Sequence, residues 1–472
     1  MDKKLLPLNP KTELLKWGPL PGRYYFVSDF DAIYTVFPKK YPGEYWSRAL
    51  IIFKGKTLIW INEFPEARKC GKSVFLKFMV PETKQKKVIK KWRNNLKILN
   101  KVEERIKKTN LSKLSSGQFV DLWKESENAL MGFWEDVVIP ELANYGSDKI
   151  LELSLKKYIK NKTEINSAME ILTAPENLSF YKKEEMDLLK AKDIKKHAKK
   201  YFWIQNSYAG TKIADLDFFK KRKKYLPPNL EIELKRIRNK TQEKKQELAK
   251  KYNLPENILR ISNAIVDGIE WQDERKGHVF IYLHYKNLLI EEAARKLSVS
   301  KDDLLNFGTK EILEFLKKKS ADEVKNRRNS FAIVMDKKRI EYLDSKIAKR
   351  FWNIYVEEKV SGNIKEFRGI TVSKGKSLVN GKVKIVLDPL KVSSFKQGNI
   401  LVAPMTTPDY IFLMKKASAV ITDTGGLTSH AAIVSRELGI PCIVGTKIAT
   451  RVLKDDQLVE VNANQGIVKI IS

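Results

Sequence analysis

The stretch that decides the fold of this chain is TGGLTSHAAIVSRELGIPCIVG, residues 424–445. The residues before it, 417–423, are apolar and β-branched, which predicts a buried strand. Gly425 and Gly426 then allow the tight turn that must follow such a strand. Residues 442–444 read as the next strand. We therefore expect a strand, a glycine turn, a short helix and a second strand.

The helix within this stretch has clear start and stop signals. Thr428 or Ser429 can cap its first turn, and Gly439 followed by Pro441 ends it. His430 is thereby placed at the helix N-terminus. Unpaired amides and a partial positive charge there stabilise an anion and disfavour a protonated imidazole. We expect an uncharged, exposed ring that can act as a nucleophile.

A lone histidine is more often a capping or core residue than a reactive one. The glycines, hydroxyls and helix stop around His430 favour the reactive interpretation. We therefore predict that His430 is catalytic. The residues expected to support its loop or a bound phosphate are Thr424, Gly425, Gly426, Thr428 and Ser429.

The C-terminal region resembles the phosphohistidine swivelling domain of the phosphoenolpyruvate-utilising enzymes, the family of phosphoenolpyruvate synthase, pyruvate phosphate dikinase and rifampicin phosphotransferase. The resemblance implies that His430 carries a phosphoryl group between two active sites and that the domain has a β/β/α fold. The stretches that carry it are residues 369–370, 381–383, 400–409, 414–419 and the whole His430 segment.

The length and net charge of the chain limit the number of domains and the kinds of partner that can be expected. A chain of 472 residues is too long for one ordinary core, so two or three domains are expected. The net charge is +33, and residues 366–472 hold only 14 basic against 8 acidic side chains. The excess thus belongs mainly to the N-terminal part. It fits a polyanion such as RNA, but lysines spread over helix faces fit a lysine-rich proteome or an acidic partner subunit better.

Cys70 and Cys442 lie far apart in unrelated segments, so neither a disulfide framework nor a metal site is indicated. The first residues lack a signal-peptide core, and no apolar run is long enough for a membrane span. These features predict a cytoplasmic protein without a membrane partner.

The early part of the chain, about residues 20–63, has short β-like segments at 24–27, 49–53 and 57–61. The turn Lys54-Gly55-Lys56 between the last two predicts a hairpin.

From 81 to 357 the apolar residues recur at helical spacing. Pro140, Pro175, Pro227 and Pro255 are expected to break this region into separate helices.

The sequence therefore predicts a multidomain α+β protein, with a mostly helical N-terminal domain that contains a small β element. The expected boundaries are a β-containing segment at 1–80, a helical domain that binds the acceptor at 81–360, a linker at 361–366 and the swivelling domain at 367–472.

Enzymes that the C-terminal region resembles also have an ATP-grasp module that loads the histidine, and no glycine-rich phosphate loop precedes His430 here. The expected function is a phosphotransferase subunit of the kinase or dikinase type. An ATP-grasp protein in trans, using ATP and Mg²⁺, would load His430. No intrinsic cofactor is expected.

The N-terminal part loosely resembles the helical segment that precedes the swivelling domain in those enzymes, which implies that it binds the acceptor. Glu270, Asp273, Arg275 and His278 lie within two turns of one predicted helix and could supply a base for an acceptor hydroxyl. A solvated charged face is the alternative. The acceptor itself stays unidentified.

A second hypothesis for the whole chain is a basic scaffold or RNA-binding protein that has kept an inherited fold. Binding to RNA that survives loss of His430 would distinguish it from the phosphotransferase.

Overall fold

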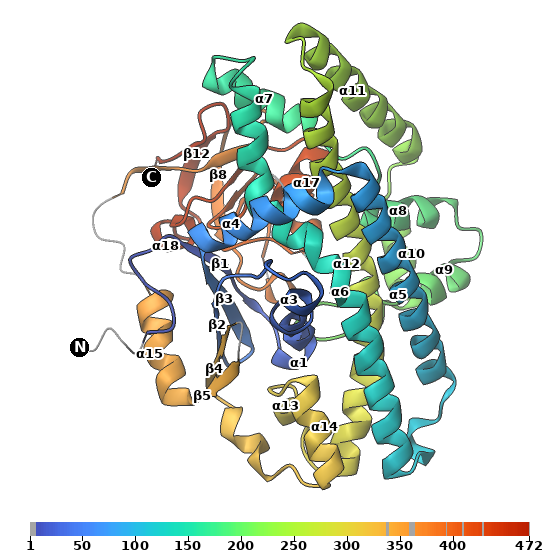
Figure 1. Ribbon diagram of the computed structural model, residues 1–472. Coiled ribbons are helices and arrows are strands. Elements are labelled where there is room, and N and C mark those ends of the chain that lie inside the picture. Colours follow the sequence, from blue (N-terminus) through green and yellow to red (C-terminus); the bar gives the residue numbers. More distant parts are fainter. Residues whose placement is uncertain are drawn as a thin grey trace.

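The computed structural model describes residues 6–336, 339–357, 364–392, 394–407, 410–426 and 429–471. A helical part with a five-stranded sheet lies beside a C-terminal part built on an eight-stranded sheet (Figure 1). Residues 361–363 of the expected linker at 361–366 lie outside the described residues.

The N-terminal sheet is antiparallel and has the strand order β1-β3-β2-β4-β5. The predicted hairpin is confirmed, because β2 and β3 pair across a two-residue turn in which Gly55 has a φ of 59°. Two strands come from the range expected to be helical. The strands are β1 (Leu14–Pro21), β2 (Ala49–Lys54), β3 (Thr57–Glu63), β4 (Ser330–Met335) and β5 (Ile340–Leu343).

Short helices fill the space beside this sheet. Residues 24–27, expected as a strand, form helix α1, in which all four side chains are buried. The short helices are α1 (Tyr24–Val27), α2 (Ala32–Thr35), α3 (Phe37–Lys40), α13 (Lys301–Leu304) and α14 (Thr309–Lys318), and α15 (Ser345–Tyr355) covers the opposite face.

Long helices form the body of the molecule: α4 (Phe64–Val74), α5 (Glu82–Lys108), α6 (Ser116–Leu155) and α12 (Glu256–Leu297). The expectation that Pro140 ends a helix is wrong, since it lies inside α6. Buried side chains flank it on both sides, so packing outweighs the lost backbone hydrogen bond. Its carbonyl accepts a hydrogen bond of 2.8 Å from Gln272 on α12. Pro175, Pro227 and Pro255 do lie between or before helices.

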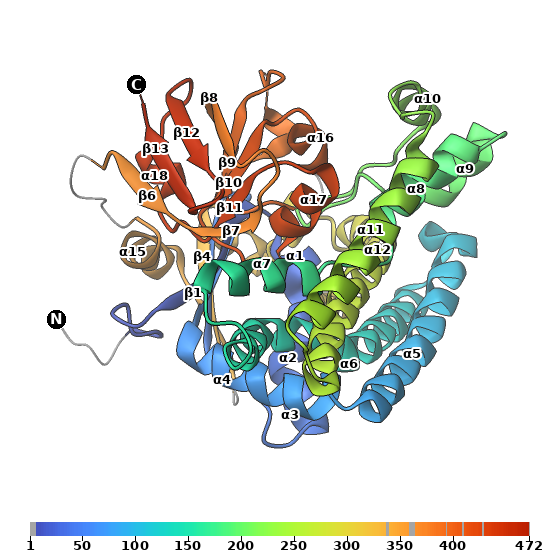
Figure 2. The same ribbon diagram turned by 90° about the horizontal axis from the view of Figure 1, so that it is seen from above.

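A second group of helices projects beside the swivelling domain in Figure 2: α7 (Lys162–Leu172), α8 (Phe180–Lys190), α9 (Ile194–Tyr201), α10 (Leu216–Lys224) and α11 (Leu230–Lys251). Among the described helices, none is both long and apolar enough to cross a membrane.

The C-terminal sheet has the order β6-β13-β12-β8-β9-β10-β11-β7, and its central strands β8 to β11 are parallel. Its strands are β6 (Glu366–Arg368), β7 (Ile370–Ser373), β8 (Leu378–Ile385), β9 (Ile400–Ala403), β10 (Ala419–Thr422), β11 (Cys442–Val444), β12 (Leu458–Asn462) and β13 (Ile467–Ile470).

Helices cover both faces of these parallel strands, so β9 and β10 are buried throughout. On one face lies α18 (Ala449–Val452). On the other lie α16 (Ile411–Met414) and α17 (His430–Leu438), which Figure 2 shows on the side that faces α8 and α12. Apolar side chains on this second face join the core of the helical part. The swivelling domain is therefore docked on the helical domain.

Candidate active site

The carboxyl ends of β9 and β10 bring together the two segments that form the site. Thr406 follows β9, and His430 follows β10 and its glycine turn. Because the two strands are parallel neighbours, both loops leave the sheet at the same edge. Thr406 Oγ1 lies 2.9 Å from His430 Nδ1. This hydrogen bond orients the imidazole ring.

The backbone before His430 has the predicted form. Gly425 has a φ of 123°, and a Cβ there would approach Ser429 to 3.1 Å, so the turn requires glycine. The amide of Ser429 donates to Gly426 O over 3.0 Å. Ser429 caps the helix, because its hydroxyl accepts from Ala432 N at 3.3 Å. The helix ends at Gly439 with a left-handed φ of 64°, as expected.

Of the two threonines expected to support the site, Thr424 links two loops of the swivelling domain. Thr424 ties its own loop to the loop after β9, since its amide and its hydroxyl both donate to Pro404 O, at 2.9 and 3.1 Å. Thr428 lies outside the described residues. Thr424 therefore supports the site through the backbone that carries Thr406 and not by touching the ring.

The environment of the imidazole differs from the expected exposed position. His430 is only partly exposed, and its Nε2 is buried without a hydrogen-bond partner among the described residues. Burial holds the pKa of His430 well below its usual value, and the positive charge of Lys276 lowers this pKa further. The ring is therefore neutral, as predicted, but its burial is the main cause, where we had expected the helix N-terminus.

The charge of Lys276 on α12 acts on His430, and that of Asp273 on the same helix acts on Glu437 of α17. We call Lys276, Asp273 and Glu437 the polar seam. Glu437 follows His430 by two helical turns and so lies on the same face of α17. Asp273 precedes Lys276 by one turn of α12 and accepts a hydrogen bond of 2.7 Å from the amide of Phe180. Burial raises the pKa of Asp273 to about 6 and that of Glu437 to about 7, and the charge of Asp273 adds to the second shift.

Sequence reasoning missed Thr406, Lys276 and Glu437 as parts of this site. Thr406 and Glu437 lie inside the stretches that carry the family resemblance, but nothing in their spacing relates them to the ring. Lys276 comes from a distant helix. Only the docking of the two domains brings it to His430, and no local pattern encodes that contact.

The four residues expected to form an acceptor site do not converge, because successive positions on α12 point about 100° apart. Glu270 and Asp273 bind the backbone of the segment that leads into α8. Arg275 instead pairs with Glu141 of α6 at 2.8 Å. His278 lies against Trp92 of α5, with ring centroids 6.2 Å apart. Only Asp273 belongs to the seam.

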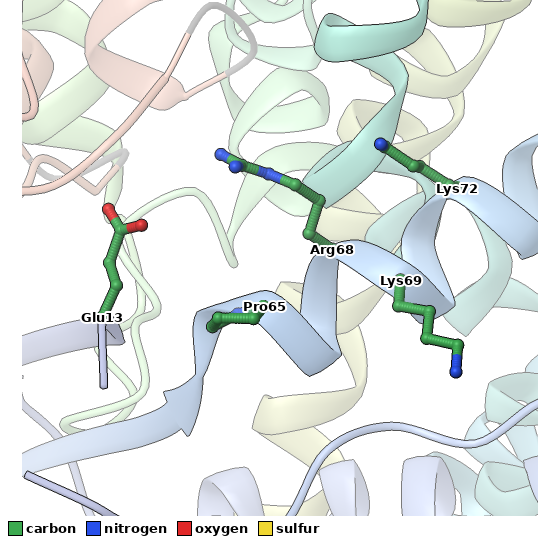
Figure 3. Close-up of a pocket in the computed structure, with 5 residues that line it drawn as sticks. All are labelled: Glu13, Pro65, Arg68, Lys69 and Lys72. Carbon is green, nitrogen blue, oxygen red and sulfur yellow. The ribbon is translucent and has the colours of Figure 1, made fainter. Parts of the chain in front are cut away.

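A cavity of about 290 Å³ lies beside α4, away from these residues. Figure 3 shows its lining of Glu13, Pro65, Arg68, Lys69 and Lys72, in which the Lys69 amine points away from the Arg68 guanidinium. Glu13 already pairs with Lys447 of the swivelling domain over 3.4 Å. The lining side chains do not converge on one point, so the seam at His430 is the stronger candidate site.

The fold and this histidine define a phosphohistidine-type swivelling domain, and comparison with known proteins agrees. Residues 395–466 match the family model described as "PEP-utilising enzyme, mobile domain". The C-terminal region of the chain is thus similar to the mobile domain of the phosphoenolpyruvate-utilising enzymes.

Similar proteins share this C-terminal region. A probable phosphoenolpyruvate synthase from Archaeoglobus fulgidus is 50% identical over 113 residues, which are 24% of this chain and 15% of that protein. The phosphoenolpyruvate synthase of Pyrococcus furiosus is 50% identical over 101 residues, 21% of this chain and 12% of that protein. An uncharacterized phosphotransferase of Bacillus subtilis, YvkC, is 44% identical over 104 residues, 22% and 12% of the two chains. The chain thus matches less than a fifth of the length of each relative.

Proposed function

We propose that this chain is the phosphohistidine-carrying component of a phosphotransferase. His430 accepts a phosphoryl group on Nε2 and passes it to an acceptor bound at the helical domain. The observation that carries this proposal is the geometry of the ring. One nitrogen of a neutral imidazole is held by Thr406, and the other is buried without a hydrogen-bond partner among the described residues, while the charge of Lys276 acts on the ring.

The chemistry requires a lone pair on Nε2. We place the ring proton on Nδ1, where the Thr406 hydroxyl accepts it, so that Nε2 keeps its lone pair. In loading, the bond from Nε2 to phosphorus forms and the bond from phosphorus to the donor's leaving group breaks. In transfer, the bond from Nε2 to phosphorus breaks as the acceptor oxygen attacks. The charge of Lys276 stabilises the phosphoryl oxygens in the transfer step, when the domains are docked.

Asp273 is the residue of the seam best suited to take the acceptor's proton, because a pKa of about 6 makes it an effective base near neutral pH. Loading is assigned to an ATP-grasp protein in trans that uses ATP and Mg²⁺. The relatives named phosphoenolpyruvate synthase support this division of labour, since the match covers 15% and 12% of their length and leaves most of it outside. The free thiols of Cys70 and Cys442 fit a reducing compartment such as the cytoplasm.

The test is phosphorylation of the purified full chain. One arm supplies ATP, Mg²⁺ and an ATP-grasp protein encoded beside this chain, and a second arm supplies phosphoenolpyruvate. A third arm uses phosphoramidate, a chemical donor that releases ammonia as it phosphorylates imidazoles. The readout is acid-labile phosphate located by mass spectrometry.

We expect label on His430 in the native chain and in a His284→Gln control, and none in His430→Gln. Absence of label with all three donors, or label that persists in His430→Gln, would contradict the proposal.

A further inference from the structure

A buried group of charged residues lies where α8 meets the swivelling domain. On one face of α8, Lys182 Nζ lies 3.0 Å from Glu185 Oε2, and both side chains are at most 8% exposed. Arg222 of α10 binds Glu184 at 2.8 Å and Glu185 at 3.2 Å. His197 of α9 completes the group through Glu184 at 3.0 Å. The helical domain thus supplies several opposite charges that already compensate one another.

The swivelling domain adds a charge to this group. Lys415, the residue that follows α16, forms an ion pair with Glu185. One turn earlier, the ring of Phe412 lies 5.2 Å from the Arg222 guanidinium and 6.4 Å from the ring of Phe218. These contacts join α16 to α8 and α10, helices that are distant from it in sequence.

In a second interaction between the two domains, the swivelling domain supplies the negative charge and the helical domain the positive one. The positive charge of Lys182 acts on Glu437 of α17 and lowers the pKa that burial raises. The swivelling domain therefore presents a lysine to Glu185 and a carboxyl to Lys182, which are neighbours on α8. Opposite charges arranged in this way favour one docked orientation over rotated ones.

We propose that Lys415 is a positioning residue, whose ion pair with Glu185 holds the swivelling domain in the orientation that brings His430 to Lys276. The catalytic meaning of that orientation rests on the proposed function, but the orientation itself does not. Loss of the Lys415 charge leaves Glu185 with Lys182 and Arg222, so the helical domain keeps its buried pairs. Loss of the Lys415 charge is therefore expected to weaken the docking of the swivelling domain without unfolding the helical domain.

The experiment follows the imidazole signals of the full chain by nuclear magnetic resonance as the pH is varied. The chain has only four histidines, so His430 is assigned by comparison with His430→Gln. In the docked chain burial and Lys276 lower the pKa of His430. We expect Lys415→Met to raise the pKa of His430 toward its ordinary value.

Two variants serve as controls. Lys416→Met removes the neighbouring exposed lysine and leaves the titration of His430 as in the native chain. Lys415→Arg keeps the positive charge and restores most of the native titration. If His430 titrates in folded Lys415→Met as it does in the native chain, Lys415 does not position the domain.

This measurement needs neither a donor nor an acceptor. A raised pKa in Lys415→Met together with no phosphorylation of His430 would support the positioning role and contradict the proposed function. Phosphorylation of His430 with an unchanged pKa in Lys415→Met would do the reverse.

Discussion

Replacement of Glu437 by glutamine tests the buried seam between α17 and α12. Burial raises the pKa of this carboxyl from 4.5 to about 7. Below pH 4.5 the side chain is protonated in the folded and the unfolded chain alike, so it contributes no pH dependence there. As the pH rises from about 4.5 to about 7, the unfolded chain releases its proton first, and the folded state becomes less stable.

The magnitude follows from the size of the shift. A difference of about 2.5 pKa units at 1.36 kcal/mol per unit gives at most about 3 kcal/mol, reached above about pH 7. Glutamine stays neutral at every pH. We therefore expect the free energy of unfolding of Glu437→Gln to equal that of the native chain near pH 4 and to exceed it by up to about 3 kcal/mol near pH 8.

Urea unfolding followed by far-ultraviolet circular dichroism, repeated across this pH range, measures the difference between the two chains. Glu366→Gln, which changes an exposed carboxyl on β6, is the matched control. A gap between the native and Glu437→Gln chains that stays constant with pH would refute the reasoning, because Glu437 would then be ionised over the same range in both states.

Two further predictions concern the loop of His430. Thr406→Val keeps the shape of the side chain but removes the hydroxyl on Nδ1, so we expect phosphorylation of His430 by phosphoramidate to slow about fivefold, the equivalent of about 1 kcal/mol for one hydrogen bond. An unchanged rate would show that Thr406 does not prepare the ring. Gly425→Ala forces an L residue to a φ of 123° and within 3.1 Å of Ser429, and should destabilise the chain by about 2 kcal/mol in the same urea assay. Gly426→Ala meets no atom within 4 Å and should be nearly neutral; equal losses in both would contradict the steric argument.

Elements whose signals are local could be predicted from the sequence. The hairpin at Gly55, the Ser429 cap and the stop of α17 at Gly439 each depend on a few consecutive residues, and the structure has all three. The helix at residues 24–27 and the continuity of α6 through Pro140 could not, since both depend on burial by distant segments. The same holds for β4 and β5, which pair with strands from the start of the chain.

The candidate site divides in the same way. The neighbourhood of His430 along the chain was predictable, because glycine and capping residues fix the turn. The contacts of its side chain were not, since Lys276 belongs to a helix more than 150 positions earlier in the sequence. Helical spacing also placed Arg275 and His278 on faces of α12 that turn toward α6 and α5.

The covered Nε2 of His430 has a consequence for any loading enzyme. An unmodified imidazole whose Nε2 is buried in the docked chain is hidden from an outside active site, so such an enzyme meets only those molecules whose domains have parted. Its apparent affinity for this chain falls in proportion to that open fraction. Whatever loosens the closed arrangement therefore governs how fast the histidine is charged, even when the loading enzyme itself is unchanged.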